Sequence, residues 1–369
     1  MSAEALPAGH VVVREQPPIR WIVSPRYDLC FFIGSAVFTF LFYLLYREAG
    51  RMGWFLGGDQ ILVTYFVFTA FFDHPHIFQT FARTHADPEE FQRRKGLHTW
   101  GLAAFVGIGI VVALLRLESE LIVFAAIYGT WHIIRQHFGF IRLYKSLNED
   151  KEPLDNWLDY GTFYSGAFAC LLNDYTDLRE PIHIYGALRV RFPDLPSGAG
   201  EALWGVFLVL LVLLGFRQVW LVGLGRRPNL PKLLLMSTAL FTHWFVFFAT
   251  ATPFLVAEAL ETAYHDIQYQ GWIMHYQRRR FAVRHVVLKW ALLALAYGLC
   301  VGAIETLGLM RAGWSWLFVP FTMLVIWHYF VDGKIWKFSQ DSELRAVFFS
   351  PREERGEKTT PIGEERRSA

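Results

Sequence analysis

Histidines and carboxylates recur near the ends of several apolar stretches of this chain. The stretch FFDHPHIFQTFAR carries Asp73, His74 and His76. Asp73, His76 and Thr80 are spaced by three and four residues, which predicts that they share one helical face. Pro75 removes a backbone donor and is expected to kink the helix. That kink would turn His74 toward the site that Asp73 and His76 face.

A second group of this kind lies in YGTWHIIRQHFGFIRLY. His132 and Gln136 are four residues apart and share a face, whereas a straight helix turns His137 about 140° away from His132. The two histidines are therefore expected to serve one site only if it is dinuclear. Arg135 is expected either to extend its charged end toward water or to neutralise an anionic substrate.

The stretch AEALETAYHDIQYQGWIMHY carries the most specific pattern in the chain. Its polar and aromatic side chains step by three or four residues and form one stripe: Glu258, Glu261, His265, Gln268, Trp272 and His275. Glu261 and His265 are spaced as a carboxylate–histidine ligand pair in a helix bundle. Alternatively, Glu261 orients the imidazole of His265 without touching a metal.

A fourth group lies in WHYFVDGKIWKF, where His328 and Asp332 are four residues apart. This spacing predicts either a ligand pair or a histidine oriented by a carboxylate. His243 lies near the middle of a further apolar stretch, where a single histidine is expected to be a hydrogen-bonded packing residue.

The composition indicates that these stretches lie in a membrane. The chain has 369 residues, of which 54% are hydrophobic, 17% are aromatic and 18% are charged, and its mean hydropathy is +0.28. Soluble proteins usually have more charged residues. A net charge of +2 gives no reason to expect a nucleic-acid partner. The predicted fold class is an all-α, polytopic transmembrane helix bundle surrounded by membrane lipids.

A transmembrane helix needs about 20 mainly apolar residues. By that criterion we expect about ten spans, at residues 28–46, 60–82, 97–116, 120–143, 158–173, 202–221, 233–253, 256–276, 286–306 and 313–331. The segment 158–173 is short, so it is expected either to span with a tilt or to be re-entrant or buried.

Basic residues collect in alternate connections, as they do on the cytoplasmic side of membrane proteins. Residues 226–232 and 278–284 are both basic, so the chain is expected to cross twice between them. Both termini are then cytoplasmic, and the histidines fall in the cytoplasmic half of the bilayer. The predicted location is a bacterial inner membrane, crossed several times.

This scheme divides the chain into three parts. Residues 1–27 form a cytoplasmic segment, residues 28–338 form the transmembrane domain with a metal site near the cytoplasmic face, and residues 339–369 form a charged, solvated tail.

Imidazole and carboxylate together favour iron, zinc or manganese. The predicted metal ligands are His74, His76, His132, His137, His265, His328, Asp332 and Glu261, with Asp73 as a further orienting group. Gln136 and Gln268 are expected to hydrogen-bond substrate or bound oxygen. A buried, lipid-accessible site suits a mononuclear or dinuclear non-haem iron that oxidises a lipid or isoprenoid substrate.

The segment HIIRQH, from His132 to His137, resembles the HxxxxH box of the membrane desaturases. Scattered intramembrane histidines are also similar to those of the bacterial carotene-cleaving dioxygenases. The chain lacks the His–His dipeptide of the other desaturase boxes. The resemblance implies iron and dioxygen, hence an oxidoreductase of lipid metabolism. No glycine-rich nucleotide motif is present, so we expect a separate electron donor.

Two other functions fit the same residues. Histidines on facing helices are the axial ligands of haem b in electron-transfer proteins, and Gly129 and Gly139 flank the pair on residues 120–143. Intramembrane His, Asp and Glu are also typical of proton-coupled transporters. Zinc is the alternative to iron as a bound ion.

Overall fold

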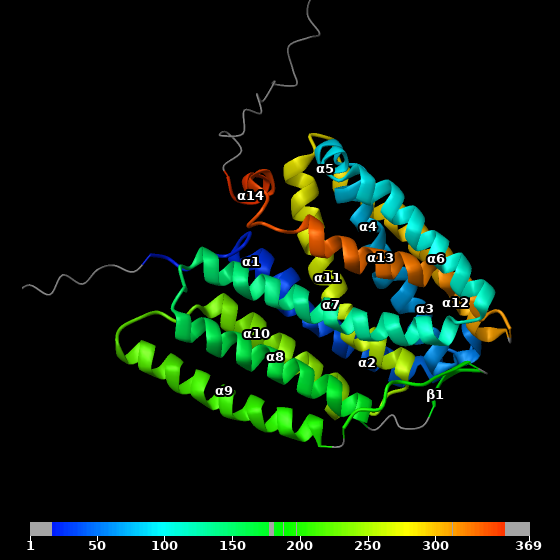
Figure 1. Ribbon diagram of the computed structural model, residues 1–369, viewed down its shortest axis with the longest axis horizontal. Helices are drawn as coiled ribbons and strands as arrows, with labels where there is room; N and C mark the ends of the chain where they lie inside the picture. Colours follow the sequence, from blue (N-terminus) through cyan, green and yellow to red (C-terminus); the bar gives the residue numbers. More distant parts are fainter. Residues whose placement is uncertain (1–16, 177–180, 187, 197, 312, 351–369) are drawn as a thin grey trace, which may run out of the picture.

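The protein is an almost entirely helical bundle (Figure 1). Its computed structural model describes residues 17–176, 181–186, 188–196, 198–311 and 313–350. The helices are α1 Pro25–Asp28, α2 Val37–Glu48, α3 Gln60–Phe68, α4 His74–Thr84, α5 Pro88–Arg93, α6 Leu102–Leu115, α7 Glu118–Leu147, α8 Pro153–Thr176, α9 Ala199–Gly223, α10 Leu230–Trp244, α11 Phe254–Arg280, α12 Val286–Met310, α13 Val319–Ile335 and α14 Ser342–Phe349.

Short 3-10 and π-helical segments extend several of these helices: η1 Leu29–Ile33, η2 Gly34–Ala36, η3 Ala49–Arg51, η4 Leu56–Gly58, η5 Thr69–Asp73, η6 Leu97–Gly101, η7 Phe245–Ala249 and η8 Ser315–Phe318. One antiparallel hairpin is also present, formed by β1 (Ile182–Tyr185) and β2 (Leu188–Val190). The all-α expectation therefore holds apart from this hairpin.

Seven helical segments of the described chain are long and apolar enough to cross a membrane, which indicates a multi-pass membrane protein. They are Pro25–Arg51, Gln60–Thr84, Leu97–Leu115, Ala199–Gly223, Leu230–Ala249, Val286–Met310 and Ser315–Ile335. Each overlaps one of the spans expected from the sequence. The remaining expected spans form α7, α8 and α11, with 30, 24 and 27 residues. At 1.5 Å per residue, each exceeds the ~30 Å hydrocarbon core.

The helix α11 owes its polar composition to its position among other helices. It packs against α2, α3, α4, α7, α12 and α14 and lies inside the bundle in Figure 1. Nearly every side chain from Leu255 to Ile273 is buried or half-buried. A helix that contacts protein rather than lipid needs no apolar outer face. By contrast, α9 lies at one side of the bundle, next to α8, and much of its apolar surface is exposed.

The segment Gln60–Thr84 changes its helical geometry before the first histidines. The helix α3 ends at Phe68, one π-helical turn follows, and α4 begins at His74. Pro75 has no N–H, and its ring would clash with the carbonyl four residues earlier in a regular α-helix. A π-helical turn widens the backbone at that point and is common at functional sites.

Two glycines of α12 allow close packing against this π-helical turn. A Cβ on Gly298 would lie 2.3 Å from the carbonyl oxygen of Ala70 and 2.6 Å from Cδ of Pro75. A Cβ on Gly302 would lie 3.0 Å from the nitrogen of Ala70. Small residues let helices approach closely in membranes. The backbone that carries Asp73 and His76 is therefore held against α12.

Arginines and carboxylates close the end of the bundle at which α4 and α11 finish. Arg83 donates to Asp87 Oδ2 at 2.7 Å and to Asp341 Oδ2 at 3.2 Å, and Arg280 donates to Asp87 Oδ1 at 2.8 Å. Burial alone would raise the pKa of Asp87, but hydrogen bonds from Arg280 and Tyr276 lower that pKa below its usual value. The carboxylate is thus ionised and fixes both helix ends.

Part of the tail expected to be solvated is folded. Residues 342–349 form α14, and the Asp341 carboxylate accepts a hydrogen bond from the nitrogen of Leu344 at 2.9 Å. The ring of Phe348 stacks on Trp272 with centroids 4.2 Å apart. Burial of these apolar side chains against α11 explains the difference from the expectation. Residues 1–16 and 351–369 lie outside the described part of the chain.

The glycine contact generates a test. We expect Gly298→Ala to lower the stability of the protein by about 1–3 kcal/mol, because the added methyl group meets backbone and proline atoms that have no space to move. The measurement is the thermal unfolding midpoint in detergent. Gly215→Ala in α9 is the matched control, since its Cβ meets nothing within 4 Å. Equal midpoints for the two variants would contradict the tight-packing argument.

Candidate metal centre

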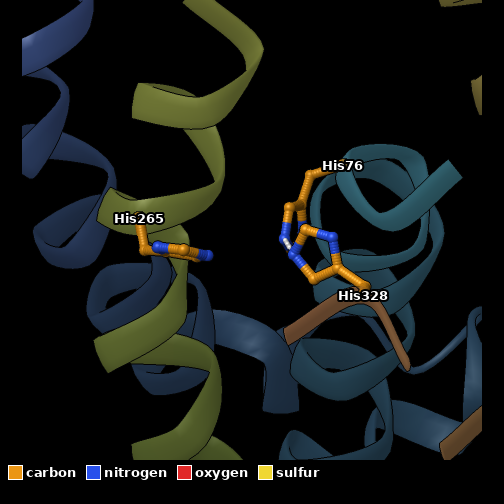
Figure 2. Close-up of side chains that lie close together, drawn as sticks. All are labelled: His76, His265 and His328. Atoms are coloured by element: carbon orange, nitrogen blue, oxygen red, sulfur yellow. Dashed lines mark hydrogen bonds between the residues drawn. The ribbon is translucent and has the colours of Figure 1, made fainter. Parts of the chain in front are cut away.

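Four histidines from four helices converge inside the bundle: His76 of α4, His132 of α7, His265 of α11 and His328 of α13. The most exposed of them, His132, has 8% of its surface accessible. Neighbouring ring centroids are 4.7 to 5.1 Å apart. Figure 2 shows His265 pointing from α11 toward His76 and His328, whose rings lie side by side.

The shortest contact in this cluster joins Nε2 of His76 to Nε2 of His328, at 3.0 Å. The other nitrogen of His76, Nδ1, lies 2.8 Å from Oδ1 of Asp266. A carboxylate at one ring nitrogen holds the proton there and leaves the opposite nitrogen unprotonated. With its proton on Nδ1, beside this carboxylate, His76 would present a lone pair on Nε2 to the cluster.

A chain of hydrogen bonds assigns the same tautomer to His328. Tyr269 donates its hydroxyl proton to Asp332 Oδ1 at 3.3 Å, so its oxygen accepts from Thr80 at 3.2 Å. The Thr80 oxygen then accepts from Nδ1–H of His328 at 2.6 Å. With its proton on Nδ1, His328 also presents a bare Nε2.

Two lone pairs that face each other at 3.0 Å repel, and either a proton shared between the nitrogens or a cation bound by both removes that repulsion. Two nitrogens bound at right angles to one ion, each at about 2.1 Å, are about 3.0 Å apart. Both ring nitrogens of His265 and Nε2 of His132 are buried and have no hydrogen-bond partner among the described residues. Such groups are costly to bury unless something binds them.

The donor set also fits a metal ion. The ligand atoms of His76, His265 and His328 lie within 4.8 Å of one another, and so do those of His132, His328 and Asp332. Nitrogen donors with a neighbouring carboxylate suit iron or zinc. Asp266 and Thr80 orient two of the rings from outside the set, which is how proteins usually fix metal-ligating histidines.

The structure places His74 outside this cluster. Its Nε2 lies 3.0 Å from Oε2 of Glu305, and Tyr65 donates its hydroxyl to the same oxygen at 3.0 Å. The π-helical turn and Pro75 do not bring His74 and His76 to one centre. The two side chains point to different helices, α12 and α13.

His137 and Glu261 form a second group with His243. The rings of His137 and His243 are 5.8 Å apart, and Nδ1 of His243 lies 3.3 Å from Oε1 of Glu261. Thr130 donates to the other oxygen of Glu261 at 3.3 Å. Because His132 and His137 diverge on α7, they join different groups. His243, expected only to pack, therefore lies beside two predicted ligands.

The three residues expected to be catalytic make contacts within the protein. Gln136 donates to Gln268 Oε1 and to the carbonyl of His265, both at 3.2 Å, and Gln268 donates to the carbonyl of Phe32 at 2.7 Å. These bonds tie α7 and η1 to α11 beside the cluster. Arg135 is exposed and donates to the Tyr164 hydroxyl of α8 at 3.0 Å, away from the cluster.

Sequence reasoning missed Asp266, Tyr269 and Glu305. Asp266 and Tyr269 directly follow His265 and Gln268 of the polar stripe of α11. They therefore lie off the helical face that the three- and four-residue spacing defines. Glu305 had a clear signal, since it is a carboxylate in the apolar segment Val286–Met310, and ionisable groups in such segments are usually functional.

No family model, no curated protein and no solved structure matches this chain.

The cluster makes a direct prediction about metal binding. His76→Ala and His265→Ala should each abolish stoichiometric metal, and Asp266→Asn should weaken metal affinity about 10–100-fold by releasing the His76 ring. Elemental analysis of the purified variants and metal titration measure this.

Two variants serve as controls for this experiment. His183→Ala changes an exposed histidine of β1 and should retain the metal. His137→Ala should retain it too if the second histidine group is independent. Full metal content in a His76→Ala, His265→Ala double variant would refute the assignment.

Proposed function

We propose that this protein is an integral-membrane, metal-dependent oxidoreductase, specifically a non-haem iron oxygenase, hydroxylase or desaturase acting on a lipid or isoprenoid. The observation that supports it is the 3.0 Å contact between Nε2 of His76 and Nε2 of His328, next to buried ring nitrogens of His132 and His265 that have no hydrogen-bond partner among the described residues.

The metal would be held by His76, His265 and His328, with His132 and Asp332 as further ligands. Bound iron would supply the activation of dioxygen that oxidation of an unactivated C–H bond requires, because side chains alone cannot provide it. Zinc fits the same donors but does not undergo redox chemistry. The electrons are proposed to come from a separate donor protein.

The surrounding residues have positioning roles. Asp266 and Thr80 keep the protons of His76 and His328 on Nδ1, so that both Nε2 atoms stay available. Gln136 and Gln268 hold α7 at a fixed distance from α11. The burial of all four histidines excludes bulk water, which protects reactive intermediates from side reactions.

The geometry does not favour haem b. Two axial histidines of one haem lie on opposite sides of the iron at about 2 Å each, so their nitrogens are about 4 Å apart. The Nε2 atoms of His76 and His328 are 3.0 Å apart, which leaves no room for a macrocycle between the two rings.

We also propose that the chain crosses the membrane about ten times, with α7, α8 and α11 added to the seven apolar segments, and that both termini are cytoplasmic. Support comes from the basic connections at 226–232 and 278–284, which the rule of positive cytoplasmic loops assigns to one side. A bacterial inner membrane is the location expected for such a chain.

Reporter fusions test this topology. A fluorescent protein placed after residue 225 or after residue 350 should be bright, and alkaline phosphatase at the same positions should be inactive. The same reporters placed after residue 195, between β2 and α9, should behave in the opposite way. If the reporters after residues 195 and 225 give the same result, α9 does not cross, and the ten-span topology is wrong.

The enzymatic proposal is tested on protein loaded anaerobically with ferrous iron. We expect stoichiometric iron, an absorption spectrum without a Soret band, and oxygen uptake that depends on added membrane lipids or isoprenoids and on a reductant. The His265→Ala variant should lose both the iron and the oxygen uptake, while His183→Ala should keep both. A Soret band, or no bound metal after loading with iron and with zinc, would overturn the proposal.

A further inference from the structure

The histidine cluster lies too deep in the bundle for a soluble protein to touch it. His76, His265 and His328 are at most 1% exposed, and His132 is 8% exposed. An electron from a separate donor protein must therefore cross side chains of this chain, and the rate of electron transfer falls steeply with distance. Aromatic rings in contact divide that distance into short steps, because the π electrons of tyrosine and tryptophan are among the most easily removed and replaced in proteins.

Tyr269 of α11 is the aromatic residue that contacts two rings of the cluster at once. Its ring centroid is 5.4 Å from that of His76 and 5.4 Å from that of His328. Its side chain is buried, at 1% exposure. An electron on this ring would be one contact away from two of the proposed metal ligands.

Trp336 continues the aromatic contacts from Tyr269 to the end of the bundle. The two ring centroids are 6.3 Å apart. Trp336 directly follows the last residue of α13 and is half-buried, so part of it reaches the surface. Its ring also packs against Trp272 and Tyr276 of α11, at 5.7 and 5.6 Å. Two aromatic side chains therefore connect the cluster to the surface at which α13 ends.

The surface around Trp336 carries unbalanced positive charge. Lys334 is exposed and Lys337 is half-buried, and neither forms an ion pair within the described part of the chain. The carboxylates that follow, Asp341 and Glu343, pair with arginines instead. Positive groups of this kind attract a partner whose surface is acidic. In the proposed topology this end of the bundle faces the cytoplasm, where soluble carriers are present.

A second aromatic contact of the cluster leads in a less suitable direction. The Tyr329 ring stacks on His132 with centroids 4.7 Å apart and is 5.6 Å from the ring of Tyr128. Tyr128 is 5.8 Å from Phe124, which is 54% exposed. An exposed phenylalanine on a long helix of a membrane bundle suits contact with lipid rather than with a soluble protein.

From these contacts we infer that Tyr269 and Trp336 form the electron path into the proposed iron centre, and that an acidic one-electron carrier protein docks at Trp336, beside Lys334 and Lys337. One electron passes from the reduced carrier to oxidised iron. The carrier is thereby oxidised, the iron is reduced, and no bond is made or broken. The inference rests on the proposed function, because it needs an iron that changes its oxidation state.

The experiment uses the full-length protein in phosphatidylcholine nanodiscs, loaded with iron, oxidised to the ferric state and mixed without oxygen with a reduced, acidic [2Fe–2S] ferredoxin. The visible absorption of the ferredoxin reports its oxidation, and the ferric electron paramagnetic resonance signal reports arrival of the electron. Trp336→Leu should lose most of this reduction while it retains the iron. Trp290→Leu is the matched control, since this half-buried tryptophan of α12 packs on Phe78 instead, and it should keep the reduction.

A double charge reversal tests the docking surface without touching the aromatic contacts. Lys334→Glu with Lys337→Glu should slow the reduction by ferredoxin at least about tenfold at low ionic strength, because rim charges act mainly on the rate of association. Reduction by the small reductant methyl viologen should be unchanged. Lys289→Glu, at an exposed lysine of α12, is the control and should behave as the unmodified protein. This pair of variants keeps the test decisive if Trp336→Leu does not fold.

Metal analysis of the same samples separates this inference from the proposed function. Absence of bound iron would overturn the enzyme and, with it, the electron path. Bound iron that ferredoxin reduces equally fast in the unmodified protein, in Trp336→Leu and in the lysine variant would overturn the path and leave the metal centre intact. Failure of ferredoxin to reduce iron that methyl viologen does reduce would overturn the acidic carrier. Loss of the reduction in Tyr128→Leu but not in Trp336→Leu would overturn the path through Tyr269.

Discussion

The contact between Nε2 of His76 and Nε2 of His328 is the interaction around which this protein is arranged. In a membrane bundle no water is at hand to satisfy a polar group, so each one must find its partner within the protein or bind a ligand. Asp266 lies 2.8 Å from the outer nitrogen of His76, and the chain through Thr80 and Tyr269 hydrogen-bonds the outer nitrogen of His328. The inner nitrogens are left facing each other, and this is the arrangement that a metal ion stabilises.

That constraint explains why the most polar long helix is the most enclosed. The helix α11 supplies His265, Asp266, Gln268 and Tyr269 to the centre and its surroundings. Such a helix is stable in a membrane only when other helices cover it on all sides. The close approach of α12 at Gly298 also positions the cluster, because it holds the backbone before His76 at a fixed distance from the helices around it.

Much of this arrangement could be predicted from periodicity and charge. Residue spacing placed His132 and His265 on inward faces, and hydropathy located the seven apolar segments. The position of His74, outside the cluster and next to Glu305, could not be predicted, because the local effect of Pro75 depends on whether the backbone kinks or forms a π-helical turn. Asp266 could not be assigned either, because its role depends on where the neighbouring helix places His76. Contacts between helices are set by packing, which no single helical period encodes.

The order of the histidines along the chain has a consequence for how the centre is assembled. His76 and His328 are 252 residues apart, and His328 lies on the last of the long helices. During synthesis the other three histidines enter the membrane well before their final partner is made. All four histidines are therefore present only after α13 has been synthesised, so the proposed metal ion would be inserted late. Chains that stop short of α13 would be left with buried imidazoles that lack this partner, which makes them natural targets for membrane quality-control proteases.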